Sequence, residues 1–376
     1  MIWFIVALVV IITIVVSLVI ILSRAPYKSA NYHPLSPNTL RANYRDKQFH
    51  NDHMPQHQSA TNESSILFRF LFQRIHGARP NKPIATDKTN LLTLDPQTDL
   101  AVWLGHSSSF IQLDGMRFLI DPVFSNNASP IPATNRAFAG SNIYVATDMP
   151  AIDYLLITHD HWDHLDYPSI VALKEKVHHV IVPLGVGGYF RQWGYPDDMI
   201  TECDWNQHTF AGKVTVVTLP AQHFSGRLFH KNRTLWASYA LLGEHKRIFL
   251  SGDSGYSSHF AAIAEQYGPF DLTFIECGQY DTAWPHVHMT PEQSAQAAAD
   301  LKSKLVITQH HSKFKLAFHR WQEPIERFIK AKTPYDYQLT CPMIGQCVTF
   351  NDPPCHHHWW QNQHEYSLTQ TITAKK

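Results

Sequence analysis

The sequence lacks an excess of charge of either sign. Its 376 residues carry 31 Lys and Arg side chains against 31 Asp and Glu side chains, so the formal net charge is zero. A protein that binds nucleic acid through its phosphates needs a basic patch or stripe, and the chain shows none. The composition therefore excludes nucleic acid as a partner.

Cysteine is also scarce. The five cysteines are an odd number, they are scattered, and no two form a CxxC pair. This pattern favours free thiols in a reducing compartment over a disulfide framework. The sequence shows no internal repeat, and with 44% hydrophobic residues the chain is long enough to bury one large core or two modest ones.

Basic residues are absent ahead of the first hydrophobic run. Residues 2–22 carry no charge, and a helix of this length would be about 30 Å long, enough to span a bilayer. A secretory signal peptide needs a basic segment before a shorter apolar core, and both are missing. We therefore predict a single transmembrane anchor at residues 1–23. Because basic residues only follow the run, the positive-inside rule predicts that the C-terminal body lies on the cytoplasmic side of the membrane.

A polar stretch, residues 24–90, follows the predicted anchor. It is rich in Asn, Ser, Pro and His and lacks periodicity, which is typical of a tether. Residues 66–75 within it form a short apolar segment with interleaved arginines. As a helix this segment can lie in the membrane interface with Arg69 and Arg74 near lipid phosphates, or it can pack on the body, and the two alternatives are compatible.

The globular domain is expected at residues 91–350, with a C-terminal tail at residues 351–376. The first part of the domain predicts three antiparallel strands, at residues 100–104, 110–113 and 116–122. The tail contains a Cys-His-His-His-Trp-Trp run, residues 355–360, which we interpret as an adventitious surface feature.

One short stretch, residues 158–164, is rich in metal-binding side chains. It reads Thr-His-Asp-His-Trp-Asp-His, directly after an apolar run that predicts a buried strand. His159 and His161 are two residues apart, so in an extended chain they point the same way and can bind one metal. Asp163 and His164 follow a turn and can face a second metal. Imidazole and carboxylate suit zinc, and two metals about 3.5–4 Å apart would share a bridging hydroxide.

Further ligand types occur where predicted strands end. The predicted strands at residues 214–219, 247–252 and 305–309 are followed by His223, Asp253 and His310. Taken alone, each histidine is commonly a satisfied polar residue and Asp253 a turn former. With 25 histidines in the chain, the alternative for residues 158–164 is a solvated loop. Together, however, the strand-end residues complete a ligand set on the rim of a sheet.

Two more histidines accompany this set. His106 follows the first predicted strand of the domain and is either a neighbour of a metal ligand or an ordinary buried histidine. His288 stands ahead of Thr290-Pro291-Glu292-Gln293, a pattern that predicts a helix with a capping box. Held at this helix entry, His288 can protonate a leaving group or bind a substrate phosphate, or it is a plain loop histidine.

The order of these residues resembles the metallo-β-lactamase superfamily over about residues 95–345. Within it the chain is similar to the phospholipases D that hydrolyse N-acyl phosphatidylethanolamine and to their bacterial relatives. Segments that carry this closer resemblance include residues 103–106, 121–124, 158–166, 182–185, 219–223, 235–238, 251–256 and 288–292. The chain departs from those phospholipases at residues 279–284 and 310–314, which weakens transfer of the substrate.

The resemblance implies an α/β fold, a four-layer αβ/βα sandwich, with two zinc ions as cofactors. By the family pattern one zinc is held by His159, His161 and His223, the other by Asp163, His164 and His310, and Asp253 bridges the two.

The implied activity is that of a membrane-anchored dizinc phosphodiesterase, which cleaves an N-acylated phospholipid to phosphatidic acid and N-acylethanolamine. Asp253 and His288 would be catalytic, while His106, Arg69 and Arg74 would contact the substrate. The partners would be the phospholipid and the bilayer, and a homo-oligomer is compatible with the sequence. The alternatives are a lactonase acting on a sugar-phosphate-like lactone and a metal-dependent lipid-binding protein without turnover.

Overall fold

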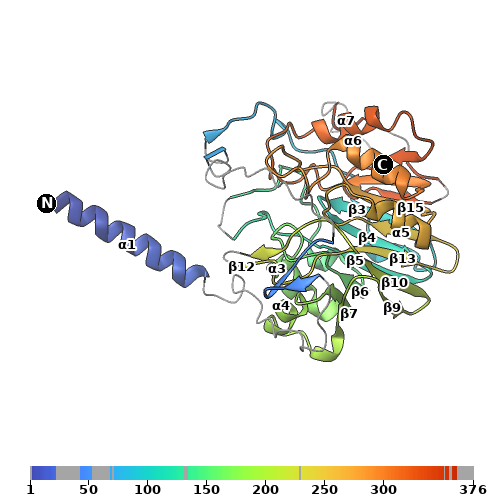
Figure 1. The fold of residues 1–376 in the computed structure, drawn as a ribbon, viewed down its shortest axis with the longest axis horizontal. Helices are drawn as coiled ribbons and strands as arrows, with labels where there is room; N and C mark the ends of the chain where they lie inside the picture. Colours follow the sequence, from blue (N-terminus) through green and yellow to red (C-terminus); the bar gives the residue numbers. More distant parts are fainter. Residues whose placement is uncertain are drawn as a thin grey trace, which may run out of the picture.

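The structure is a computed structural model of the chain. It describes residues 2–22, 43–52, 68–69, 72–130, 134–227, 230–350, 352–354 and 358–361. Over this part of the chain, two seven-stranded sheets pack face to face, with helices on their outer sides (Figure 1).

The first sheet has the strand order β18-β3-β4-β5-β6-β7-β8. Its strands are β3 (Leu100–Gly105), β4 (Ser108–Leu113), β5 (Met116–Ile120), β6 (Ile152–Leu156), β7 (Val177–Pro183), β8 (Ile200–Cys203) and β18 (Cys347–Thr349). Strands β3, β4 and β5 pair antiparallel, which confirms the prediction for the start of the domain. Strands β5 to β8 are parallel.

The second sheet has the order β17-β16-β15-β14-β13-β10-β9. Its strands are β9 (Gln207–Ala211), β10 (Val214–Leu219), β13 (Ser238–Leu242), β14 (Arg247–Leu250), β15 (Leu272–Glu276), β16 (Leu305–Gln309) and β17 (Gln338–Thr340). Strands β14 to β17 are parallel, and β10 runs in the same direction because both β10 and β14 pair antiparallel with β13. Two short hairpins, β1–β2 (Tyr44–Arg45 and Gln48–Phe49) and β11–β12 (Gly226–Arg227 and His230–Lys231), lie outside the sheets.

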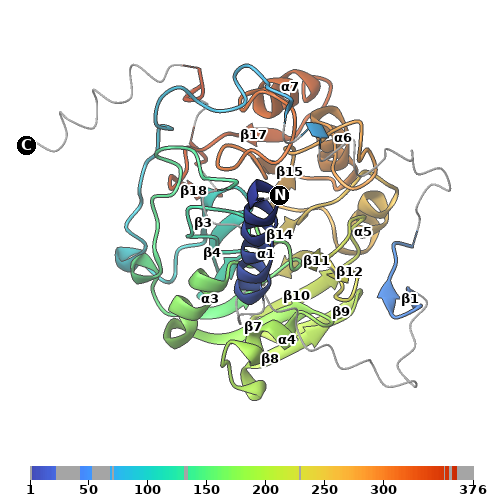
Figure 2. The same ribbon diagram turned by 90° about the vertical axis from the view of Figure 1, so that its left-hand side faces the viewer.

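Helices cover the outer side of each sheet. They are α3 (Tyr167–Leu173), α4 (Gly187–Gln192), α5 (His259–Tyr267), α6 (Pro291–Asp300) and α7 (Glu323–Ala331), with short 3-10 turns at Leu91–Thr93, Ala146–Asp148, Lys174–Lys176 and Asp197–Met199. Figures 1 and 2 show α3 and α4 on one side of the two sheets and α5, α6 and α7 on the other. This mixed α/β architecture of four layers is the one that the family resemblance implied.

The core explains why the strands read as continuous apolar runs. All six residues of β3 are buried, as are all five of β15 and of β16. A strand covered on both faces has no polar side to alternate with. One apolar cluster fills the space between the sheets and extends beneath α5, α6 and α7, and a second lies between the first sheet and helices α3 and α4.

The strand directions bring the candidate ligands to one edge of each sheet. In the first sheet β3, β5 and β6 run the same way, and so do β10, β14, β15 and β16 in the second. Carboxyl ends of strands that run the same way open onto one rim, where α/β folds place their ligands. The loops after these strands carry residues 106, 121, 158–164, 223, 253 and 310, and residue 276 is the last of β15.

At the N-terminus the chain forms the predicted helix, α1, from Ile2 to Leu22. Within the described residues, no helix is both long and apolar enough to cross a membrane. The described side chains of α1, at residues 3–13 and 15–17, are exposed. The transmembrane assignment of this helix is therefore not supported.

Parts of the predicted tether lie against the body. Phe49 is completely buried in a small cluster with Leu235 and Trp236, and Thr86 forms a bridge with Ile344. Of the short amphipathic segment, residues 66, 67, 70 and 71 lie outside the described residues.

The tryptophans of the C-terminal run are packed inside the protein. Trp359 and Trp360 are 1% and 0% exposed, and the indole of Trp359 donates to the carbonyl of Cys341. Our interpretation of this run as a surface feature is therefore wrong for the two indoles, whose large apolar rings are stabilised by burial. Residues 355–357 and 362–376 lie outside the described residues.

Candidate metal centre

Three histidines converge in what we call the three-histidine group: His159, His161 and His223. His161 Nδ1 lies 2.8 Å from His159 Nε2 and 3.2 Å from His223 Nε2. Ligands of one tetrahedral zinc at about 2.0–2.1 Å lie roughly 3.3 Å from one another. The three nitrogens therefore fit a single small cation.

Burial keeps these imidazoles in the form that binds metal. It holds the pKa of His159 and of His223 well below the usual value, and it also lowers the pKa of His161. The Nδ1 atom of His223 lies 2.9 Å from the carbonyl of Val287. A proton on Nδ1 donates to that carbonyl and leaves the lone pair of Nε2 free for a metal.

Asp163, His164 and His310 form a second group, called here the carboxylate group. Asp163 Oδ2 lies 3.5 Å from His164 Nε2 and 3.3 Å from His310 Nε2. His106 Nε2 lies 2.8 Å from the same oxygen, so this buried histidine contacts a candidate ligand. The His164 Nε2 atom is buried without a hydrogen-bond partner among the described residues, as expected for an atom that ligates a metal.

Asp253 lies between the two groups. Its Oδ2 atom is 3.1 Å from His310 Nε2 and 3.2 Å from His164 Nε2, and it is 3.9 Å from His159 Nε2 and 3.8 Å from His223 Nε2. Its Oδ1 atom is buried without a hydrogen-bond partner in the described part of the chain. A carboxylate in this position can be shared by two cations.

Charge distinguishes the carboxylate group. Burial alone would raise the pKa of Asp163 and Asp253, but the neighbouring histidines hold both values well below the usual one. Burial alone would lower the pKa of His310. The Asp253 carboxylate and other neighbouring carboxylates instead raise this pKa to about 10. Two buried ionised carboxylates need positive charge beside them, which the protonated histidines or a bound metal can supply.

Two further carboxylates stand behind these ligands. Asp121 Oδ2 lies 2.7 Å from His164 Nδ1, and its carboxylate accepts hydrogen bonds from the backbone and hydroxyl of Thr158. Glu276 Oε2 lies 3.0 Å from His288 Nδ1 and 3.5 Å from His310 Nδ1. Carboxylates that hold the far nitrogen of a ligating histidine orient the ring and increase its basicity.

Glu276 was not among the residues predicted from the sequence. It is completely buried at the end of β15, and the strand-end rule that found Asp253 and His310 would have found it as well. Asp121 was noted only as part of a motif, because its role depends on a partner 43 residues away.

His288 lies beside the carboxylate group, and the predicted capping box is confirmed. The Thr290 side chain accepts from the Gln293 backbone, and the Gln293 side chain accepts from the Thr290 backbone. The His288 ring stacks on His310 with centroids 5.1 Å apart, and its side chain is 13% exposed. The His288 side chain is therefore partly exposed beside the carboxylate group, and we call this place the entrance of the site.

Arg69 and Arg74 are not among the side chains gathered at this centre. The Arg69 guanidinium donates two hydrogen bonds to Asp281, at 2.8 and 2.9 Å, and covers the ring of Phe318. Arg74 is exposed. Arg69 thus contacts the loop that leads to His288.

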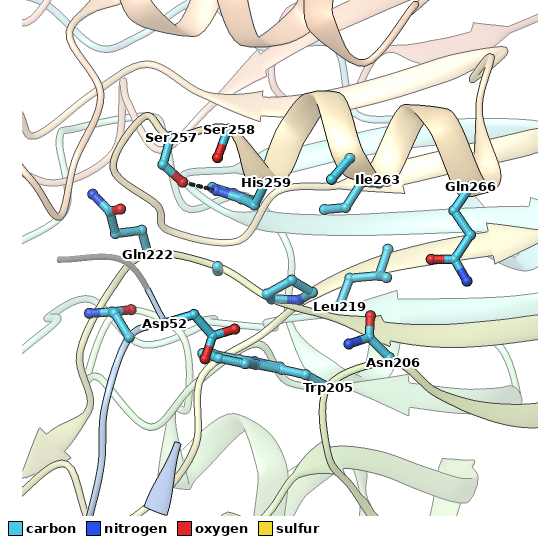
Figure 3. Close-up of a pocket in the computed structure, with 14 residues that line it drawn as sticks. Asp52, Trp205, Asn206, Leu219, Gln222, Ser257, Ser258, His259, Ile263 and Gln266 are labelled. Carbon is cyan, nitrogen blue, oxygen red and sulfur yellow. Dashed lines mark hydrogen bonds between the residues drawn. The ribbon is translucent and has the colours of Figure 1, made fainter. Parts of the chain in front are cut away.

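A pocket of about 260 Å³ lies close to the loop that carries His223 (Figure 3). Asp52, Trp205 and Gln222 line it together with the start of α5. None of the candidate metal ligands borders it, so the chemistry of the site resides in the two ligand groups rather than in this pocket.

The fold and the two ligand groups are those of a metallo-hydrolase. The family model for the β-lactamase superfamily domain matches residues 116–311. The chain belongs to this superfamily, as its strand-end ligands indicated.

The chain is also similar to individual proteins of known sequence or structure. An uncharacterized protein of Mycobacterium tuberculosis is 39% identical over 324 residues, which cover 85% of this chain and 87% of that protein. The N-acyl-phosphatidylethanolamine-hydrolyzing phospholipase D 1 of Caenorhabditis elegans is 31% identical over 228 residues, 56% of this chain and 63% of that protein. Among solved structures, CmlA, a diiron β-hydroxylase from Streptomyces venezuelae, is similar in fold with a TM-score of 0.51 at 20% identity, covering 68% of this chain and 55% of that chain.

Proposed function

We propose that this protein is a phosphodiesterase that hydrolyses N-acyl phosphatidylethanolamine-like phospholipids to phosphatidic acid and N-acylethanolamine. The observation that carries the proposal is the position of Asp253 Oδ2, within 3.1 to 3.9 Å of imidazole nitrogens from both ligand groups. The similarity to a nematode phospholipase D of this specificity supports the substrate.

The metal that we propose is a pair of zinc ions. One would be held by the three-histidine group, the other by the carboxylate group, and Asp253 would be shared. Zinc suits these nitrogen and oxygen donors, and iron, named for CmlA, is the alternative that metal analysis distinguishes. When bound, the metals supply positive charge at the phosphate and lower the pKa of the attacking water.

His288 is the residue that we propose to act on the leaving group. With Nδ1 held by Glu276, its Nε2 atom can donate a proton to the alkoxide of the departing N-acylethanolamine or a hydrogen bond to the phosphate. The stacking on His310 keeps the ring at the entrance, where a phosphodiester would arrive.

Apolar side chains near the entrance support a lipid substrate. Phe224 is 38% exposed, and its ring lies 4.6 Å from that of His161 and 4.7 Å from that of His223. Phe68 and Phe72 are also exposed and flank Arg69, which is bound to the loop that leads to His288. We propose that these rings meet acyl chains at a membrane surface on the cytoplasmic side, with the exposed apolar side chains of α1 assisting attachment.

The test is hydrolysis of vesicles that contain an N-acylated phosphatidylethanolamine, with both products measured by mass spectrometry. We expect the metal-loaded chain to form phosphatidic acid and N-acylethanolamine in equal amounts. His288→Gln should reduce turnover by about 100-fold or more, the range for a general acid. His245→Gln, at a histidine whose side chain is 79% exposed, is the matched control and should leave the rate unchanged.

Two other outcomes would replace the proposal. Hydrolysis of lactones without any cleavage of phosphodiesters would identify a lactonase. Binding of the vesicles without turnover of either class by the fully loaded protein would identify a lipid-binding protein.

A further inference from the structure

Residues 43–52, which we call the strap, dock beside the three-histidine group. The hairpin β1–β2 turns at Asp46 and Lys47, both with positive φ angles. Phe49 anchors it in an apolar cluster, and the Phe49 N–H donates to the carbonyl of Asn232 at 2.8 Å. The strap is therefore anchored to the body by Phe49, next to the residues of the strap that contact the metal centre.

Asn51 is the residue of the strap that makes this contact. Its Nδ2 atom donates to the carbonyl of His223 at 2.7 Å, and its Oδ1 atom accepts from the His223 N–H at 3.0 Å. The indole of Trp236 donates to the same Oδ1 atom at 3.0 Å and so fixes the orientation of the amide. One side chain thus binds both backbone groups of a candidate ligand 172 residues away.

The backbone of His223 depends on this amide. His223 lies beyond the end of β10, where the sheet no longer supplies partners. Within the described residues, Asn51 alone bonds to its N–H and its carbonyl. An amide offers a donor and an acceptor side by side, whereas Asp lacks the donor and Leu lacks both. The ring of His223 is held at Nδ1 by Val287, so backbone and ring are fixed separately.

We propose that Asn51 is a positioning residue of the metal centre, and that metal binding at the three-histidine group and docking of the strap favour each other. The inference rests on the proposed role of His223 as a metal ligand. Because such coupling is reciprocal, loss of the Asn51 contact weakens metal binding, and loss of metal loosens the strap. The carboxylate group, which Asn51 does not touch, is unaffected.

The test uses the full chain and Co²⁺ alone as the probe. Metal is withdrawn with a chelator of known affinity while the visible absorption of bound Co²⁺ is followed. In Asn51→Leu, and to a lesser degree in Asn51→Asp, we expect one of the two ions to bind about 10- to 100-fold more weakly, the range for residues that orient a ligand. The control is Asp52→Asn, at an exposed neighbour that contacts neither ligand group.

A second measurement separates positioning from simple packing. Hydrogen exchange at the Phe49 and His50 amides should slow by about tenfold or more when Co²⁺ is added to the wild-type chain, and this effect should vanish in Asn51→Leu. The inference would be overturned if both Asn51 variants bound both ions with unchanged affinity. It would also be overturned if Co²⁺ did not change the hydrogen-exchange rate of the strap amides in the wild-type chain. Neither measurement uses a substrate, so a chain that passes both but cleaves no phosphodiester would refute the proposed function alone.

Discussion

The two ligand groups sit about Asp253 but differ in charge. In the three-histidine group, burial lowers the pKa of all three imidazoles, so they are neutral before a metal arrives. In the carboxylate group, Asp163 and Asp253 are ionised, and the pKa of His310 is raised to about 10. A metal that binds the carboxylate group must displace a proton from His310. A metal that binds the three-histidine group meets neutral imidazoles and displaces no such proton.

This difference suggests how the centre is stabilised. The three-histidine group relies on exact placement of neutral rings by backbone contacts, such as those to Val287 and Asn51. The carboxylate group relies on charge, with Asp121 and Glu276 behind its histidines. Changes at shared residues should affect both groups, and changes behind one group should affect that group alone.

The largest effect is expected for the shared carboxylate. Asp253→Asn keeps the shape of the side chain but removes the charge that lies between the groups. We expect loss of metal from both groups and a fall in turnover of at least about 100-fold. This is at or above the upper limit for changes of residues that only orient a metal ligand. Metal analysis and vesicle hydrolysis on one preparation check this. Full metal content with wild-type turnover would show that Asp253 is not shared.

The next effect separates the groups. Glu276→Gln removes the charge behind His310 and His288, and should weaken only the metal of the carboxylate group, by about 10- to 100-fold. Chelator competition measures both affinities. Glu265→Gln, at an exposed position of α5, is the control. Equal weakening of both ions would break the distinction between the groups.

Arg227 tests the loop that supplies ligands to both groups. Its guanidinium is buried, donates to the carbonyls of Asp160 and Leu165, and lies 4.1 Å from the Trp162 ring centre. Arg227→Lys cannot make both bonds, so we expect a loss of about 3 kcal/mol in the free energy of unfolding. Denaturant unfolding of the metal-loaded protein checks this, and an unchanged midpoint would exclude the role.

The smallest effect concerns a buried lysine that follows His310 in the sequence. Lys313 is 1% exposed, and burial lowers its pKa from 10.5 to about 7. Between these values the unfolded chain binds a proton that the folded chain does not, so stability rises with pH across the window from about 7 to 10.5.

Lys313→Met should remove this dependence. The stability of the variant relative to wild type should therefore be about 2 kcal/mol more favourable at pH 7.5 than at pH 9.5. Thermal unfolding at the two pH values measures it. A constant difference would mean that the Lys313 ammonium is charged in the folded protein throughout.

Much of this architecture was visible in the sequence. Apolar runs covered on both faces predicted strands such as β6 and β16, and the residues that follow those strands carry the candidate ligands. The family resemblance gave the layer order, which periodicity alone does not. The strand-end rule uses only local sequence, because it needs an apolar run and the residues that follow that run.

Contacts between distant segments were not predictable in this way. Asn51 lies in a polar stretch without periodicity, and nothing near it in sequence indicates that it binds the backbone of His223. Arg227 reads as an ordinary surface arginine, although the fold encloses it among aromatic rings. Their roles depend on tertiary packing, which no short window of sequence contains.

The central claim is that two metals share Asp253. Its most direct test is anomalous diffraction from crystals of the zinc-loaded chain. We expect two peaks, one beside His159, His161 and His223 and the other beside Asp163, His164 and His310, with the Asp253 carboxylate between them. A single peak in a preparation that hydrolyses N-acylated phosphatidylethanolamine at the full rate would contradict it.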